Sequence, residues 1–223
     1  MKLIYYPLDM KCDFFPDQLN RIVMEDKEVF GKFLFHLSSS IRKEDECFYL
    51  EEKDKVLQID KTANLIASPF DLIYNKREYQ KVLFNKMIEE IQVEGMQDSM
   101  ALHLAGLLQN LEVLRNNLMY QIELDEEIDY SDIFKLFNVE IQHPKGTFVE
   151  KMLDFMGTAL ELLQRRIFFV ANCDAYIESK WYEEIVKWAS YQNVIVIFLE
   201  NKQMDSEEKI NEYILDRDLC VLH

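Results

Sequence analysis

The sequence has few of the residues that interrupt regular structure. Only five glycines and four prolines occur in 223 residues, and these residues punctuate helices and strands. The elements should therefore be long and the loops few. No stretch approaches the roughly 20 apolar residues of a membrane-spanning helix, and the apolar start of the chain is too short for a signal peptide. We expect a soluble cytoplasmic protein without a membrane partner.

Paired metal ligands are also missing from the sequence. The four cysteines are widely separated and form no CxxC pair, so we interpret them as reduced thiols that serve as small core residues; they are Cys12, Cys47, Cys173 and Cys220. None of the four histidines has another histidine, a cysteine or paired carboxylates at metal-binding spacing. We therefore expect no zinc site and can name no Cys–His or Ser–His catalytic pair.

Two catalytic motifs are absent as well. The chain contains neither the phosphate-binding loop G-x-x-x-x-G-K-[ST] nor the nucleophile motif G-x-S-x-G. Asp174 follows an apolar run at residues 167–171, where a carboxylate holds magnesium in nucleoside triphosphatases. Without the phosphate loop, we favour Asp174 as a residue that starts a helix. A degenerate nucleotide-binding or hydrolytic enzyme stays an alternative, as does an acidic α/β protein-interaction scaffold.

Positive charge is scarce. The chain has 25 Lys and Arg against 41 Asp and Glu, which gives a net charge of -16. This balance argues against a protein that coats nucleic acid, because phosphate binding depends on Lys and Arg. It does not exclude a local basic groove, because net charge says nothing about any single face.

The apolar pattern predicts an α/β fold. Short apolar or alternating runs bounded by turn-like residues predict strands at residues 2–6, 18–24, 47–50, 56–59 and 64–67. Helical spacing predicts one helix at residues 27–38. Later in the chain, apolar runs at 167–171 and 194–199 flank an amphipathic helix at 178–191, which is typical of a β-α-β unit with buried parallel strands. A strand at 139–141, a helix at 147–164, a helix at 206–216 and a strand at 219–222 complete the prediction.

A helical region interrupts this pattern. Residues 71–94 and 96–122 carry apolar positions at helical spacing and are joined at Gly95, which predicts two long helices in an antiparallel hairpin. A short helix at 133–137, capped by Ser131 or Asp129, follows. We predict a head domain of residues 1–69 plus 138–223 and an inserted, projecting α-helical leg domain of residues 70–137.

The most acidic segment follows the second long helix. Six carboxylates fall within the ten residues 123–132; they are Glu123, Asp125, Glu126, Glu127, Asp129 and Asp132. Crowded carboxylates repel one another unless a cation neutralises them, and calcium prefers such oxygen ligands. The spacing is not that of an EF-hand, because Tyr130 stands where the invariant glycine is needed. From spacing alone, a solvated helix end is the favoured interpretation.

Taken together, the order of elements and several segments resemble a known family. The similarity is densest between residues 123 and 200; it includes the acidic run, then DIFKLFNVEI from Asp132, TFVEKM from Thr147, RRIFFVANC from Arg165 and NVIVIFLE from Asn193. These segments are similar to the Csn-two family, the small accessory spacer-acquisition proteins of type II-A CRISPR systems. Head–leg–head order and length match over the whole chain.

The resemblance implies a function that spacing does not. It implies a degenerate nucleoside-triphosphatase-like head that has lost its phosphate loop, and a non-catalytic homotetrameric ring that binds double-stranded DNA ends without reading sequence. The implied partners are the CRISPR integrase proteins and the RNA-guided nuclease of the same system. It also implies that Ca²⁺ stabilises the ring, with the six carboxylates of the acidic run as candidate ligands and the coordinating subset left open; this reverses the preference for a solvated helix end. The DNA-facing residues carried over are Lys135, Lys145, Lys151 and Arg165.

Overall fold

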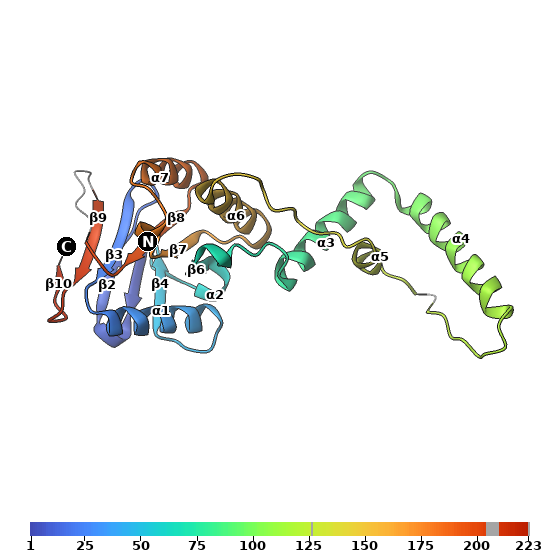
Figure 1. The fold of residues 1–223 in the computed structure, drawn as a ribbon, viewed down its shortest axis with the longest axis horizontal. Helices are drawn as coiled ribbons and strands as arrows, with labels where there is room; N and C mark the ends of the chain where they lie inside the picture. Colours follow the sequence, from blue (N-terminus) through green and yellow to red (C-terminus); the bar gives the residue numbers. More distant parts are fainter. Residues whose placement is uncertain (126, 204–209, 223) are drawn as a thin grey trace. The chain divides into compact units, whose positions relative to one another are not determined.

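The protein is described by a computed structural model that covers residues 1–125, 127–203 and 210–222. The fold is mixed α/β, and the chain divides into two compact units (Figure 1). The head unit comprises Met1–Tyr74 and His143–His223, and the helical unit comprises Asn75–Gln142. The helical unit thus lies between the two parts of the head unit in the sequence. Its boundaries fall a few residues later than those expected from the sequence.

The larger sheet of the head unit has the strand order β10-β9-β3-β8-β7-β6. Its strands are β3 (Leu19–Met24), β6 (Ala63–Ile66), β7 (Ile167–Ala171), β8 (Ile195–Glu200), β9 (Ile210–Leu215) and β10 (Val221–Leu222). All neighbours are parallel except β10, which runs antiparallel to β9. The predicted β-α-β unit is confirmed, because β7 and β8 pair in parallel and are fully buried, with α7 (Lys180–Gln192) between them in sequence.

The smaller sheet is antiparallel, with the order β2-β1-β4-β5. Its strands are β1 (Lys2–Tyr5), β2 (Met10–Asp13), β4 (Phe48–Glu52) and β5 (Lys55–Leu57). The sequence did not predict β2, which is only four residues long and follows a turn at Asp9 (φ 45°). Residues 53 and 54 both have positive φ, as a tight two-residue hairpin turn between β4 and β5 requires.

Side-chain caps start the main helices of the head unit. Asp26 accepts hydrogen bonds from the backbone N–H groups of Glu28 and Val29 at the start of α1 (Lys27–Ile41). Thr147 and Glu150 form a reciprocal capping box at the start of α6 (Phe148–Leu163). Each cap stabilises its helix by about 1 kcal/mol. The shorter helical segments are α2 (Ile59–Thr62), η1 (Tyr6–Leu8), η2 (Pro69–Asp71) and η3 (Cys173–Ala175).

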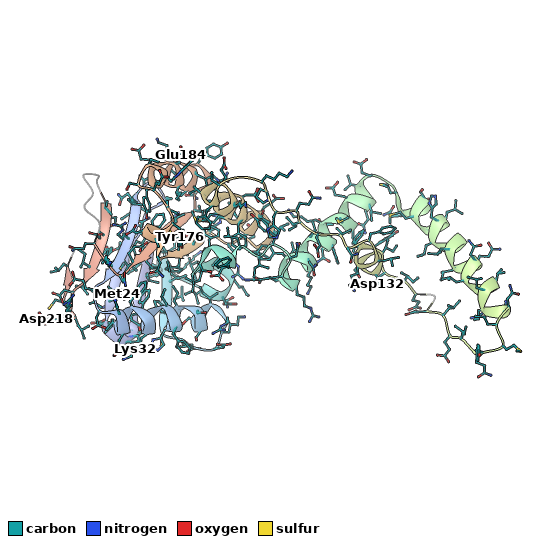
Figure 2. The ribbon with its side chains drawn as sticks, viewed as in Figure 1. Met24, Lys32, Asp132, Tyr176, Glu184 and Asp218 are labelled. Carbon is teal, nitrogen blue, oxygen red and sulfur yellow. The ribbon has the colours of Figure 1, made fainter. Side chains whose placement is uncertain are left out.

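The two faces of the larger sheet are covered by different elements. The smaller sheet and α1 cover one face, where Phe33 and Leu37 enter the main core. Lys32 lies on the exposed side of α1 (Figure 2). On the other face α7 packs against the sheet, with the ring of Tyr182 edge-on to Phe198 at 4.8 Å. Successive strand residues point to opposite faces, so the two faces carry different functional groups.

The helical unit contains α3 (Arg77–Val93), α4 (Gln97–Asn116) and α5 (Tyr130–Leu136). Its core is small and consists of Phe84, Ile91 and Phe134 with a few partly buried neighbours. Gly95 adopts φ +64° between α3 and α4, a conformation that glycine adopts without strain. Among the described residues, no helix is long and apolar enough to cross a bilayer.

The predicted antiparallel hairpin is not formed. Of the twenty residues of α4, none is buried, and Figure 1 shows α4 diverging from α3 beyond the turn at Gly95. Only Met100 of α4 packs against the core of the unit. Periodicity identified an apolar face on α4 correctly, but the pattern does not specify what covers that face. Within the described chain, the face lies open to solvent.

Three further predictions were wrong in detail. Residues 71–94 form a helix only from Arg77, because η2 and a turn precede it. Residues 139–141 are not a strand: the side chain of Asn75 bonds the backbone N–H and C=O of Ile141 at 2.9 and 3.1 Å. Instead of a helix at 206–216, residues 210–215 form β9, which extends the sheet beside β3; residues 206–209 of that prediction lie outside the described residues.

Candidate functional site

The acidic run lies in an extended segment before α5 and in its first turn. The carboxylates of this run in the described chain are all on exposed residues; these are Glu123, Asp125, Glu127, Asp129 and Asp132. Glu126 lies outside the described residues. Asp125 Oδ1 accepts a hydrogen bond from the backbone N–H of Glu127 at 3.1 Å. Lys135 Nζ lies 2.9 Å from Asp132 Oδ1, and this hydrogen bond and charge lower the pKa of Asp132. Asp125 and Asp132 therefore already accept hydrogen bonds from neighbouring residues.

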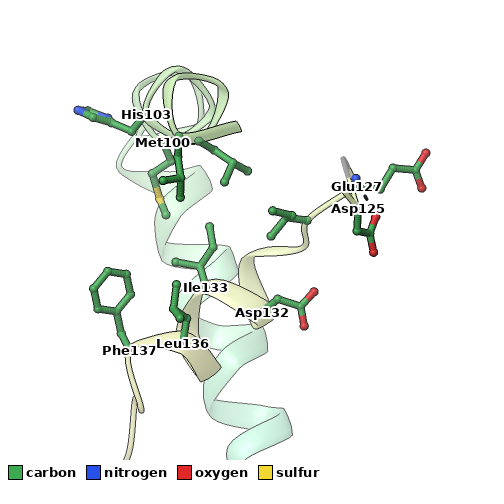
Figure 3. A pocket seen from close by; sticks show the side chains of 11 residues that line it. Met100, His103, Asp125, Glu127, Asp132, Ile133, Leu136 and Phe137 are labelled. Carbon is green, nitrogen blue, oxygen red and sulfur yellow. Dashed lines mark hydrogen bonds between the residues drawn. The ribbon is translucent and has the colours of Figure 1, made fainter. Parts of the chain in front are cut away.

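An apolar groove separates the acidic run from α4. The groove has a volume of about 630 Å³, and its apolar lining comes from α4, α5 and the segment before α5; these side chains are Met100, Leu104, Leu107, Ile128, Ile133, Leu136 and Phe137. Met100 and Ile133 point toward each other across the groove, while Asp125, Glu127 and Asp132 turn their carboxylates away from it (Figure 3). This geometry suits an apolar partner with a basic edge, because the three acids lie along one side of the apolar groove (Figure 3).

The described carboxylates of the acidic run do not converge on one point. Calcium takes six to eight oxygen ligands at about 2.3–2.6 Å, so several carboxylates must converge on one point. Among the described residues of the run, no three bring carboxylate oxygens within 4.8 Å of one another. The exposed carboxylates point outward from separate turns of the chain. The six-carboxylate calcium prediction is thus left without a preformed site in the described residues.

The four basic residues expected to face DNA are divided between the two units. Lys135 belongs to the helical unit, whereas the other three belong to the head unit. Lys145 is exposed and Lys151 half-buried, and both lie at the start of α6. Arg165 follows the end of α6, which places it about 24 Å along the helix from that start. Its guanidinium donates to the backbone carbonyl of Asp60. Lys145 and Lys151 therefore remain the pair that the fold groups together.

A buried ionic network occupies the sheet face that α7 covers. Arg21 of β3 is 1% exposed, and its guanidinium lies 3.2 Å from Asp174 Oδ1 and 3.6 Å from Glu212 Oε1. Tyr182 donates its hydroxyl hydrogen to Asp174 Oδ1 at 2.6 Å. Asp174, the residue proposed for magnesium binding in the alternative enzyme, thus already accepts two hydrogen bonds. It lies in η3 just after β7, near the helix start favoured for it from the sequence.

Glu200 completes this network at the end of β8. Glu200 is 3% exposed, and its Oε1 accepts a hydrogen bond from the backbone N–H of Asp174 at 3.3 Å. Burial, with added repulsion from Asp174, raises the pKa of Glu200 to about 7. Sequence reasoning missed this group. Its signal was an arginine inside the mostly apolar strand LNRIVM and a glutamate that ends the apolar strand IVIFLE.

A second group of polar side chains was also missed. His36 of α1 lies beside Asp45 and Cys47, which belong to the segment between α1 and β4. One ligand atom from each residue lies within 4.8 Å of the other two, and all three residues are half-buried. Within the described chain, this is where three potential metal ligands converge. No Cys–His pair could be named from the sequence, and the structure brings Cys47 and His36 close together.

The missed group has no motif spacing in the sequence. His36 and Asp45 are nine residues apart, and Cys47 follows two residues later. This spacing matches no common zinc motif, and only the turn after α1 brings the side chains together. The one available signal was that all three metal-ligand types fall within a short segment that joins a predicted helix to a predicted strand.

Comparison with known proteins places the chain in a family. The model of the family described as "CRISPR-associated protein (Cas_Csn2)" matches residues 41–219. A curated relative, the CRISPR-associated protein Csn2 of Enterococcus faecalis, is 24% identical over 102 residues, which cover 45% of this chain and 45% of the relative. The match thus spans less than half of that relative's own length. Because the family model covers well over half of the chain, the protein belongs to the CRISPR-associated Csn2 family.

Proposed function

We propose that this protein is a non-catalytic, ring-forming homotetramer that binds double-stranded DNA ends during CRISPR spacer acquisition. The observation that carries the proposal is the family-model match over residues 41–219, since it establishes a CRISPR-associated role. Lys145 and Lys151 at the start of α6 are the residues we assign to the DNA phosphates. Phosphate contacts carry no sequence information, so binding would be independent of sequence.

The connection between β3 and α1 supports a non-catalytic head derived from a nucleotide-binding fold. In such α/β folds, the loop between a parallel strand and the following helix holds phosphate with the helix N-terminal N–H groups. Here Glu25 and Asp26 occupy that connection, and the Asp26 carboxylate accepts the N–H groups of Glu28 and Val29. A phosphate would meet a carboxylate where it needs donors. The nucleoside-triphosphatase-like ancestry of the head is part of our proposal.

The open face of α4 supports self-association. Leu107, Leu111 and Leu114 are 49%, 37% and 59% exposed. Leu107 lines the groove beside α5, and Leu111 and Leu114 follow it one and two turns along the same face of α4. Isolated exposed leucines are ordinary, but a long apolar helix face marks an interaction surface. A second copy of the chain is the partner that a homotetramer requires. The groove is also a candidate contact for the integrase proteins and the RNA-guided nuclease that we propose as partners.

The test of DNA-end binding compares linear with closed-circular duplex of the same sequence. We expect the protein to shift linear DNA but not closed circles, with an affinity that falls steeply with salt. The double variant Lys145→Ala/Lys151→Ala should weaken binding and reduce the slope of log K against log[salt] by about 2, because each lost phosphate contact removes about 0.9. Failure to bind either DNA form at low salt would overturn the proposal.

A matched control separates local contacts from total charge. Lys11→Ala/Lys187→Ala removes the same number of charges from exposed positions that already pair with Asp9 and Glu183. This control should retain the wild-type salt slope. If both double variants lose affinity equally, the assignment of Lys145 and Lys151 is wrong, although end binding itself could still hold.

Calcium binding is proposed separately from DNA binding. The described carboxylates of the acidic run do not converge, so calcium binding there needs a test of its own. Calcium binding would require the segment before α5 to fold around the ion, with carboxylates from other elements supplying the remaining oxygens. A calcium titration should therefore detect ordering of this segment as the ion binds.

A further inference from the structure

The turn after α1 brings a set of metal-ligand side chains together in the head unit. Lys43 adopts φ +63°, and the backbone N–H of Glu44 donates to Ser39 O at 2.9 Å, so the chain reverses direction directly after the helix. The segment then returns past the third turn of α1, which carries His36. Cys47 is fixed by its backbone carbonyl, which accepts a hydrogen bond from Tyr6 N–H at 3.1 Å.

The distances suit a small transition-metal ion. One ligand atom each from His36, Asp45 and Cys47 lies within 4.8 Å of the others. Zinc bonds of about 2.0–2.3 Å in tetrahedral geometry place ligand atoms about 3.3–3.7 Å apart. From the 4.8 Å limit, the ligand atoms would need to close by at most about 1.5 Å, which rotation of half-buried side chains can supply.

The chemistry of the set favours zinc over calcium or magnesium. Thiolate sulfur and imidazole nitrogen are ligands for zinc-type ions, whereas calcium and magnesium take oxygen. One thiolate and one carboxylate carry two negative charges, which balance a divalent cation. The nearest basic side chains in the turn are already paired, Arg42 with Glu44 at 3.1 Å and Lys43 with Asp60 at 2.8 Å. They therefore do not place uncompensated positive charge at the site.

A second layer of contacts holds the histidine in place. The Tyr5 hydroxyl lies 2.9 Å from His36 Nδ1. The Tyr5 ring is itself rigid, because it stacks on Phe48 at 4.5 Å and meets Phe33 edge-on at 5.0 Å. Hydrogen bonds from a second layer orient the histidines of zinc sites and are worth about 10–100-fold in metal affinity. Tyr5 would serve here as such a positioning residue.

We propose that His36, Asp45 and Cys47 form a zinc-type metal site with three protein ligands and a fourth position for water. The bound ion would fasten the turn after α1 to the start of β4. The site belongs to the head unit and is distinct from the acidic run. It does not depend on the proposed DNA-binding function.

Without metal, the Cys47 thiol donates a hydrogen bond to the Asp45 carboxylate. Burial, followed by this hydrogen bond and the Asp45 charge, raises the pKa of the Cys47 thiol to about 11. The same bond, as the largest cause, lowers the pKa of Asp45. Zinc binds cysteine as the thiolate, so metal binding would release the Cys47 proton to solvent.

The experiment is a cobalt titration of the chelator-treated full chain, followed by zinc displacement. We expect one equivalent of Co²⁺ to give thiolate-to-cobalt charge-transfer absorption and the visible bands of a four-coordinate ion, both abolished by one equivalent of Zn²⁺. Cys47→Ser should remove the charge-transfer band, and Tyr5→Phe should weaken zinc binding by about 10–100-fold. The matched controls Cys220→Ser and His103→Gln alter an exposed thiol and an exposed histidine and should bind as the wild type does.

Alkylation of the wild-type chain keeps the test decisive if Cys47→Ser fails to fold. Zinc should slow alkylation of Cys47, mapped by mass spectrometry, and leave the exposed Cys220 unaffected. A cobalt spectrum without thiolate absorption, an unchanged spectrum in folded Cys47→Ser, or zinc protection of Cys220 in place of Cys47 would each overturn the proposed site.

Discussion

Replacing Glu200 by glutamine should make the protein more stable at neutral and alkaline pH. Burial and the nearby Asp174 raise the pKa of Glu200 from 4.5 to about 7 in the folded protein. Between these two pH values, the folded state keeps the Glu200 proton while the unfolded state loses it. The folded state therefore binds more protons, and the free energy of unfolding falls as pH rises through this window. Above about pH 7, the free energy of unfolding has fallen by the full amount that Glu200 contributes.

The magnitude follows from the size of the pKa shift. A rise from 4.5 to about 7 corresponds to about 3 kcal/mol at about 1.4 kcal/mol for each pKa unit. Glutamine cannot ionise, and its carbonyl oxygen can still accept the hydrogen bond that Glu200 Oε1 receives from Asp174 N–H. The Glu200→Gln variant should thus match the wild type near pH 4.5 and exceed its unfolding free energy by about 3 kcal/mol at pH 8.

Urea denaturation followed by tryptophan fluorescence at several pH values measures this difference. Other carboxylates titrate in both proteins, so the difference between the curves isolates Glu200. Glu184→Gln is the matched control, because Glu184 lies on the exposed side of α7 (Figure 2) and should give a pH-independent difference near zero. A Glu200→Gln difference that stays constant from pH 5 to pH 8 would refute the reasoning.

Three further predictions concern the buried ionic network around Arg21, the exposed face of α4 and the acidic run before α5. Arg21→Met should lower the unfolding free energy by about 3 kcal/mol, the lower end of the range for breaking buried ion pairs, because Asp174 keeps 24% exposure; an unchanged urea midpoint at pH 8 would contradict it. Leu107→Glu combined with Leu114→Glu should shift the protein toward monomer in light scattering after gel filtration, while unchanged oligomer mass would remove α4 from the interface. Asp125→Asn combined with Glu127→Gln should reduce the rise in melting temperature that calcium produces in the wild type, and an equal rise in both proteins would exclude these two carboxylates as ligands.

The parts of the fold that the sequence predicted are those that local patterns determine. The apolar runs of β7 and β8 are buried on both faces, so their composition alone indicates central parallel strands. Thr147 and Glu150 form a capping box that marks the start of α6. The apolar side chains of β7 and β8 are themselves the ones that are buried, and the side chains of the capping box themselves bond the free N–H groups at the start of α6. Prediction succeeds there because no distant partner has to be known.

The parts that the sequence did not predict depend on partners distant in the chain. Residues 210–215 carry Asn and Glu and suggested a helix, but pairing with β3 makes them a strand in which Glu212 meets Arg21. His36 approaches Cys47 only because Lys43 turns the chain back after α1. Helical periodicity likewise showed that α4 has an apolar face, but not whether α3 or another chain would cover it.

Two helix starts of the head unit differ in charge, because an acid caps α1 whereas two lysines flank the capping acid of α6. Asp26 caps α1 with its own carboxylate and takes up the N–H groups that a phosphate would use. At the start of α6 the capping acid is Glu150, but Lys145 and Lys151 lie on either side of it in sequence. A polyanion can therefore be attracted at α6 and repelled at α1. This difference between two helix starts of one head unit is how a chain with a net charge of -16 would attract DNA phosphates at a local surface, as we propose.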